Sequence, residues 1–133
     1  MVQARMPKSL RIANVVQLVL FGLMLVANLM FTVSTVGGEV ASVVTFLPPG
    51  LALIAGRADS KRLASWASLV VNTLWALLLG VLVAFIATKA PVKLAAVPVF
   101  AFVVLALWNV AVAWLRLFPA EEAGKRRAVE PTL

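Results

Sequence analysis

Four uncharged apolar stretches separate the charged residues of this chain, and they constrain its fold more than any other sequence feature. They cover residues 12–38, 40–56, 63–88 and 94–115. About 20 residues of α-helix, rising 1.5 Å each, cross a hydrocarbon core roughly 30 Å thick. Three of the stretches exceed that length, and the second is only just long enough. With 63% hydrophobic residues, the chain is predicted to be a small polytopic membrane protein.

The apolar stretches are too long and too uniform for the strands of a membrane barrel, which leaves helices as the spanning structure. We predict an all-α integral membrane protein with a transmembrane domain over residues 1–119 and a charged tail over residues 120–133. Short loops make sequence neighbours antiparallel, which predicts an up-down-up-down bundle. The four transmembrane helices are expected at about 10–34, 39–56, 61–88 and 92–117.

The basic residues fall almost entirely on alternate loops. If four segments cross, only Lys89 and Lys93 lie on the second side. By the positive-inside rule both termini are cytoplasmic. The net charge of +7 then reflects membrane orientation, and no nucleic-acid partner is expected. The Ala-, Val- and Leu-rich composition favours a bacterial cytoplasmic membrane. The residues on the first side are Arg5, Lys8, Arg11, Arg57, Lys61, Arg62, Arg116, Lys125, Arg126 and Arg127.

The two halves of the chain share some sequence. A shift of 51 residues aligns Ser9 with Ser60 and Arg11 with Arg62, and several apolar positions also match. A tandem two-helix repeat, with its axis along the membrane normal, would produce this pattern. Chance similarity between two apolar helices would produce it as well.

A helix break is predicted inside the second span. Pro48 and Pro49 remove two backbone donors and Gly50 adds flexibility, so the helix should kink or unwind near Leu47. Interrupted helices at matching places in two halves mark binding sites in transporters, and Pro98 lies at a roughly corresponding depth in the fourth helix. The alternative is a kink that serves packing alone.

Small residues recur every fourth position along the third predicted helix. Ala76, Gly80 and Ala84 are predicted to form a close helix contact, because small side chains let two backbones approach. The partner is either another helix of this chain, or a second copy or another membrane protein.

Polar and aromatic side chains within the spans could serve either helix packing or ligand binding. The amides are expected to face other helices, where they either hold helices together by hydrogen bonds or line a substrate path. Trp75 and Trp108 lie close to two of these amides and could form a wall for a flat lipophilic or cationic ligand; packing is the alternative. The amides are Asn14, Gln17, Asn28, Asn72 and Asn109.

Other residues are expected at the membrane surface. Trp66 and Trp114 fit an aromatic belt near the cytoplasmic side. Lys125, Arg126 and Arg127 form a basic cluster that could bind anionic lipid headgroups, or serve only as an orientation signal.

Catalysis and ion coupling lack candidate residues. The chain has no His, Cys or Tyr and only five acidic residues, so we expect no catalytic residues, no cofactor and no metal site. The size and helix count are similar to those of small multidrug exporters. Those depend on a glutamate in the first helix, which has no acid here, and no family is recognised.

The leading hypothesis is a small membrane protein that acts through helix packing, as an accessory, assembly or structural subunit. The alternative is a small oligomeric transporter, or a carrier of lipids or lipophilic compounds, built around Pro48-Pro49-Gly50. A third hypothesis is a membrane anchor that recruits a cytoplasmic protein through its basic tail.

Overall fold

The described part of the chain is all helical in the computed structural model, which describes residues 5–31, 43–57, 59–89, 94 and 96–119. Its helices are α1 (Lys8–Phe31), α3 (Leu47–Ala55), α4 (Arg62–Lys89) and α5 (Ala96–Leu117). Three of them, α1, α4 and α5, are long and apolar enough to cross a membrane. The 9 residues of α3 extend for only about 14 Å, less than half of a hydrocarbon core.

The second span, predicted over residues 39–56 with a break near Leu47, is interrupted at that place in its described part. A turn at residues 45–46 interrupts the helical backbone, and α3 begins at Leu47 with its two prolines in the first turn. Pro48 and Pro49 cannot donate to the carbonyls four residues earlier, as a continuous helix requires. At a helix start those donors are not needed, so the same prolines favour a new helix there. Residues 39–42 lie outside the described residues.

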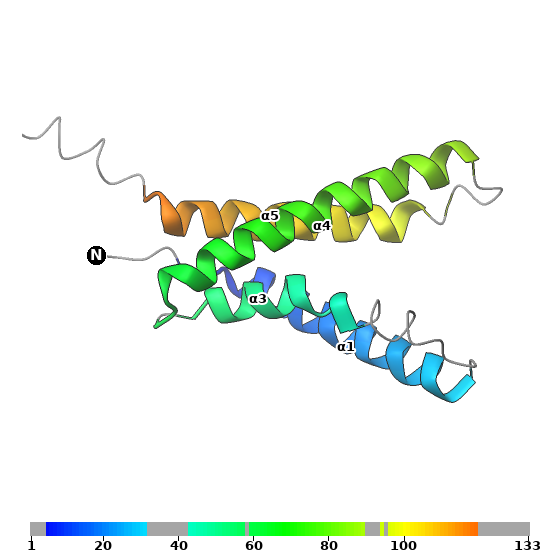
Figure 1. Ribbon diagram of the computed structural model, residues 1–133, viewed down its shortest axis with the longest axis horizontal. Helices are drawn as coiled ribbons and strands as arrows, with labels where there is room; N and C mark the ends of the chain where they lie inside the picture. The colour runs from blue at the N-terminus through cyan, green and yellow to red at the C-terminus, as the bar shows by residue number, and fades with distance from the viewer. Residues whose placement is uncertain (1–4, 32–42, 58, 90–93, 95, 120–133) are drawn as a thin grey trace, which may run out of the picture.

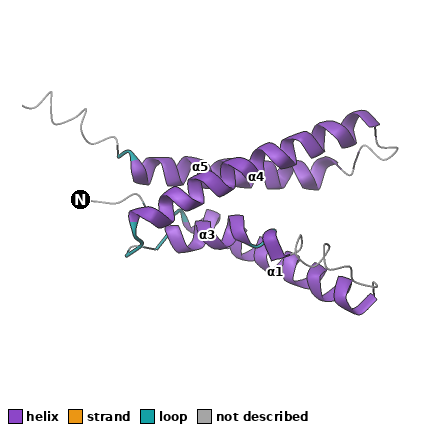
Figure 2. Cartoon of the chain, in the orientation of Figure 1, coloured by secondary structure: helices purple, strands orange, loops and turns teal. Residues whose placement is uncertain are grey.

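The helices alternate in direction along one long axis, as the short loops predicted (Figures 1 and 2). α1 and α4 begin at the end of the molecule where α3 and α5 finish. We call this the basic end, because the helix ends that carry or adjoin basic residues lie there. Lys89 lies at the opposite end of α4. The described basic residues at or near the basic end are Arg5, Lys8, Arg11, Arg57, Lys61, Arg62 and Arg116.

Burial is concentrated toward the basic end of the bundle. In α1 the described buried residues stop at Gln17, in α4 they stop at Leu79, and in α5 they begin at Ala106. Large apolar side chains are exposed along all three long helices, including Leu23 at 63% and Val81 at 71%. Such surfaces are typical of helices that face lipid, so the structure agrees with a membrane protein.

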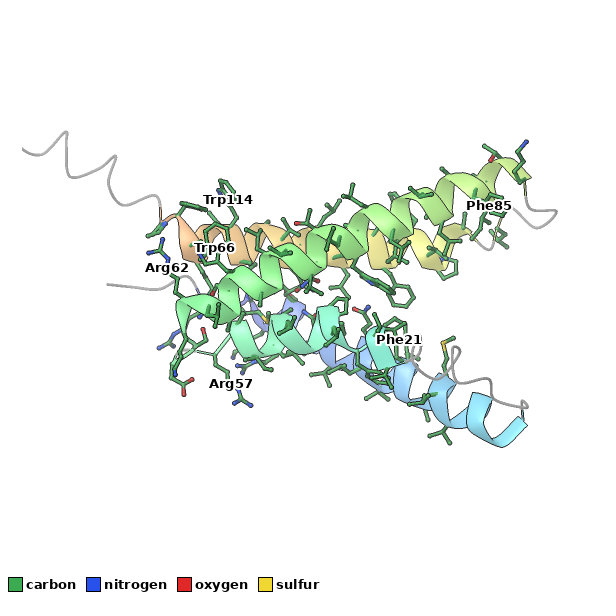
Figure 3. All side chains as sticks on the ribbon, in the orientation of Figure 1. Phe21, Arg57, Arg62, Trp66, Phe85 and Trp114 are labelled. Carbon is green, nitrogen blue, oxygen red and sulfur yellow. The ribbon has the colours of Figure 1, made fainter. Side chains whose placement is uncertain are left out.

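Aromatic side chains pack at the basic end. The ring of Phe118 contacts Trp114 at a centroid distance of 4.5 Å and Trp66, edge to face, at 5.9 Å. Figure 3 shows both tryptophans near Arg62 at this end of the molecule. Their position fits the predicted aromatic belt, where an indole ring lies between lipid and water.

Candidate functional site

Three buried asparagines meet where the long helices cross. Asn14 of α1, Asn72 of α4 and Asn109 of α5 are each 2% exposed or less. Asn14 and Asn109 exchange two hydrogen bonds of 2.8 Å, with each amide nitrogen donating to the other Oδ1. The Nδ2 of Asn109 also donates to Oδ1 of Asn72 at 3.2 Å. We call these three residues the amide network, and it joins α1, α4 and α5.

The amide network also holds α3. Asn72 Nδ2 donates to the carbonyl oxygen of Pro48 at 3.1 Å and to that of Ser68 at 2.9 Å. Asn14 Nδ2 donates to the carbonyl of Leu10 at 2.9 Å. Each carboxamide has two N–H donors, and this geometry gives every one of them an acceptor. Burying an unpaired amide is costly, so complete pairing makes the network a favourable and specific contact between helices.

A second polar contact closes the loop between α3 and α4. Arg116 of α5 donates from Nη1 to Ser60 Oγ and from Nη2 to the carbonyl of Arg57, both at 2.9 Å. Ser60 Oγ in turn donates to the carbonyl of Ala55, the last residue of α3, at 2.8 Å. The last carbonyls of a helix lack partners within it and carry partial negative charge. A cation placed there by α5 therefore stabilises the end of α3.

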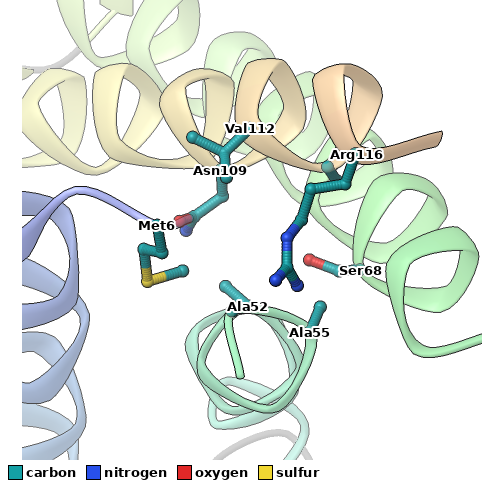
Figure 4. A pocket seen from close by; sticks show the side chains of 9 residues that line it. Met6, Ala52, Ala55, Ser68, Asn109, Val112 and Arg116 are labelled. Carbon is teal, nitrogen blue, oxygen red and sulfur yellow. The ribbon is translucent and has the colours of Figure 1, made fainter. Parts of the chain in front are cut away.

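The space between these two contacts is nearly filled. A cavity of about 10 Å³ lies between the first residues of the described chain, α3, α4 and α5 (Figure 4). That volume is about the least that holds one water molecule. This cavity therefore offers no room for a larger ligand. Its lining residues are Met6, Ala52, Ala55, Gly56, Ser68, Asn109, Val112, Ala113 and Arg116.

The structure separates the two predicted helix breaks. Pro48 and Pro49 are buried in the first turn of α3, beside half-buried Gly50. Pro98 is exposed in the first turn of α5, where a missing donor costs nothing. It precedes Asn109 by 11 residues, or about 16 Å along the helix. The two prolines of α3 and Pro98 are therefore not parts of one site.

The two tryptophans predicted to lie deep in the membrane, Trp75 and Trp108, have different surroundings. Trp108 is 42% exposed and lines a groove between α1 and α5. Trp75 is half-buried, and its Nε1 is enclosed without a hydrogen-bond partner in the described structure. The N–H donors of Asn72 and Asn109 are all used in the hydrogen bonds described above. Asn72 and Asn109 therefore have no free N–H donor for a ligand beside these rings, and a ligand wall formed by the two tryptophans stays a prediction.

The small residues of α4 differ in their contacts. Ala76 is buried and 7% exposed, whereas Ala84 is exposed. A Cβ atom added to Gly80 would have no atom within 4 Å outside its own helix backbone. The described part of this chain therefore does not supply a close helix partner at Gly80. The basic cluster of Lys125, Arg126 and Arg127 lies outside the described residues, as does the side chain of Asn28.

Sequence reasoning missed the role of Arg116. From the sequence it was one of the basic residues that set orientation, with no contact predicted for it. In the structure Ser60 Oγ accepts from Arg116 and donates to the carbonyl of Ala55 at the end of α3. One signal was present in the sequence: Arg116 directly follows an uncharged run, while the next cation is Lys125.

Comparison with known proteins gives no relative. No family model, no curated protein and no solved structure matches this chain.

Proposed function

We propose that this chain is a non-enzymatic integral protein of a bacterial cytoplasmic membrane, with both termini in the cytoplasm. It acts through helix packing, as an accessory, assembly or structural subunit. The observation that carries this proposal is the amide network, in which the polar groups at the centre of the bundle pair with one another. Side chains used in this way hold helices together and are not free to bind or transform a substrate.

The surface of α4 supports a partner within the membrane. Gly80 has open space at its Cβ position and Ala84 is exposed. These two small residues therefore do not pack against another described helix of this chain and face outward. In lipid, association depends on close packing of this kind rather than on a hydrophobic drive. A second copy of this chain or another membrane helix would find a close contact there.

Cysteine cross-linking in native membranes tests this proposal. The chain has no cysteine, so Gly80→Cys introduces the only thiol. Leu78→Cys is the matched control, because it lies at nearly the same depth and roughly 160° around the helix; Leu78 is 60% exposed. We expect oxidation to cross-link Gly80→Cys, to itself or to a partner, several times more than Leu78→Cys. Equal absence of cross-links, with a strictly monomeric protein in mild detergent, would contradict the proposal.

The alternative, a transporter or lipophilic-compound carrier built on Pro48-Pro49-Gly50, has less support. A break serves as a binding site when its backbone carbonyls are free to meet a substrate. Here the Pro48 carbonyl accepts a hydrogen bond from Asn72, and the prolines are buried at a helix start.

A further inference from the structure

A groove of about 320 Å³ lies between α1 and α5. Phe102 and Leu105 of α5 and Leu20 of α1 contribute apolar walls, and Trp108 lies along the same groove. The ring of Phe102 is fixed by Phe21, with a centroid distance of 5.4 Å. Ligand sites are typically grooves of about 300 Å³ or more, apolar except for a few polar groups, and this groove meets that description.

The polar group in the groove is the carboxamide of Gln17. This side chain is 3% exposed and lines the groove, and it has no hydrogen-bond partner among the described residues. Asn14, one turn earlier on α1, has both of its N–H donors paired. In hydrocarbon an amide without a hydrogen-bond partner is costly. A bound molecule could therefore form the hydrogen bonds that the Gln17 carboxamide lacks.

The polar group in the groove favours a small molecule over an apolar protein helix. A helix uses its backbone carbonyls in its own hydrogen bonds, so an apolar helix would offer Gln17 no acceptor. A narrow apolar molecule with a free carbonyl would offer one. The exposed face of Trp108 would give such a molecule access from the lipid.

We propose that the groove between α1 and α5 binds one lipophilic molecule whose carbonyl group accepts a hydrogen bond from Gln17. The apolar walls hold the chain of the molecule, and the carboxamide selects for the carbonyl. This site is separate from the amide network and does not depend on the proposed packing role.

Tryptophan quenching by a matched pair of probes tests the site. Replacing Trp66, Trp75 and Trp114 by Phe leaves Trp108 as the reporter. The protein is placed in lipid nanodiscs and titrated with terminally brominated dodecanone or with bromododecane, which lacks the carbonyl. We expect saturable quenching by both probes, with the ketone effective at about fivefold lower concentration, as one net hydrogen bond implies.

Two variants separate the hydrogen bond from the groove itself. Gln17→Leu should abolish the preference for the ketone and leave bromododecane quenching unchanged. Ala101→Phe, which fills the groove from its exposed α5 wall, should abolish saturable quenching by both probes. Thr88→Val, on an exposed turn of α4, should change neither titration.

Several results would overturn the proposal. Equal, non-saturable quenching by both probes in all variants would mean that Trp108 meets ordinary lipid only. A Trp108 shielded from both probes in a protein that runs as a dimer would assign the groove to a second copy. Circular dichroism of Gln17→Leu and Ala101→Phe must match the parent, and a persistent ketone preference in folded Gln17→Leu would remove Gln17 from the site.

Discussion

The two halves of the bundle differ in how their helices meet. Near the basic end four helices pack around paired amides, and the cavity between them holds no more than about one water molecule. Toward the opposite end the α1 and α3 pair diverges from the α4 and α5 pair (Figure 1). No residue of α4 after Leu79 and none of α5 before Ala106 is buried. The same apolar composition therefore gives a closed half and an open half.

The difference shows that polar contacts decide where these helices converge. Lipid solvates leucine and valine well, so apolar side chains alone give little reason for two helices to stay together. Asn14, Asn72 and Asn109 lie in the closed half, and their amides are satisfied only when the helices meet. The short helix α3 also lies in the closed half, because Pro48 and Pro49 favour a helix start at Leu47.

The largest expected effect comes from removing the centre of the amide network. Asn109→Leu deletes three hydrogen bonds and leaves Asn14 and Asn72 with unpaired polar groups. We expect a loss of about 2 kcal/mol in the free energy of unfolding, measured by titration with denaturing detergent. Thr88→Val in the open half, where the hydroxyl bonds only its own helix, should cost under about 0.5 kcal/mol. Similar losses for both variants would remove the distinction between the halves.

A smaller, local effect is expected at the end of α3. Arg116→Met removes the hydrogen bonds to Ser60 and Arg57, worth about 1 kcal/mol together. The loop should open more often, and trypsin should cut after Arg57 or Lys61 about fivefold faster. Arg11→Gln, at an exposed position on α1, is the control and should leave cleavage unchanged. If both variants are cut at the parent rate, Arg116 does not hold the loop.

A pair of glycine substitutions compares packing in the two regions. A Cβ at Gly56 would lie 3.0 Å from Met6 Cε and 3.1 Å from the Ala52 carbonyl oxygen, so Gly56→Ala should cost about 1 kcal/mol. A Cβ at Gly22 meets nothing within 4 Å, so Gly22→Ala should stabilise α1 by about 0.5 kcal/mol. Thermal melts in one detergent measure both. If Gly56→Ala melts at a higher temperature than Gly22→Ala, the account of the closed half is wrong.

The smallest effect is expected at Trp75. Its buried Nε1 has no partner in the described structure, so Trp75→Phe loses no hydrogen bond and should change stability by less than about 0.5 kcal/mol. Trp75→Ala, which also removes the ring, should cost about 2 kcal/mol or more. A large loss in Trp75→Phe would reveal a partner for the indole N–H.

The sequence predicted the three long helices well, because the length of an uncharged run directly limits a helix in lipid. Pro48 and Pro49 correctly located a break, but not that a separate, short helix begins there. The hydrogen bonds of Asn14, Asn72 and Asn109 could not be chosen from sequence, since both a packing and a lining role fit isolated amides. Their pairing depends on how far each helix is rotated and shifted against the others.

The proposed repeat also fails to locate these contacts. Under the 51-residue shift, Asn14 aligns with Ser65, Asn72 with Phe21 and Asn109 with Ala58. The residues that join the helices are therefore not repeated between the halves, and the repeat stays a prediction.

A double-mutant cycle on Asn14 and Asn109 tests the central claim most directly. Asn14→Leu, Asn109→Leu and the double variant are unfolded under the same conditions, and their losses in free energy are compared. The reciprocal hydrogen bonds predict a coupling of about 1 kcal/mol, so that the second substitution costs much less than the first. Losses that add within about 0.3 kcal/mol would contradict the account, because the two amides would then not hold the closed half together.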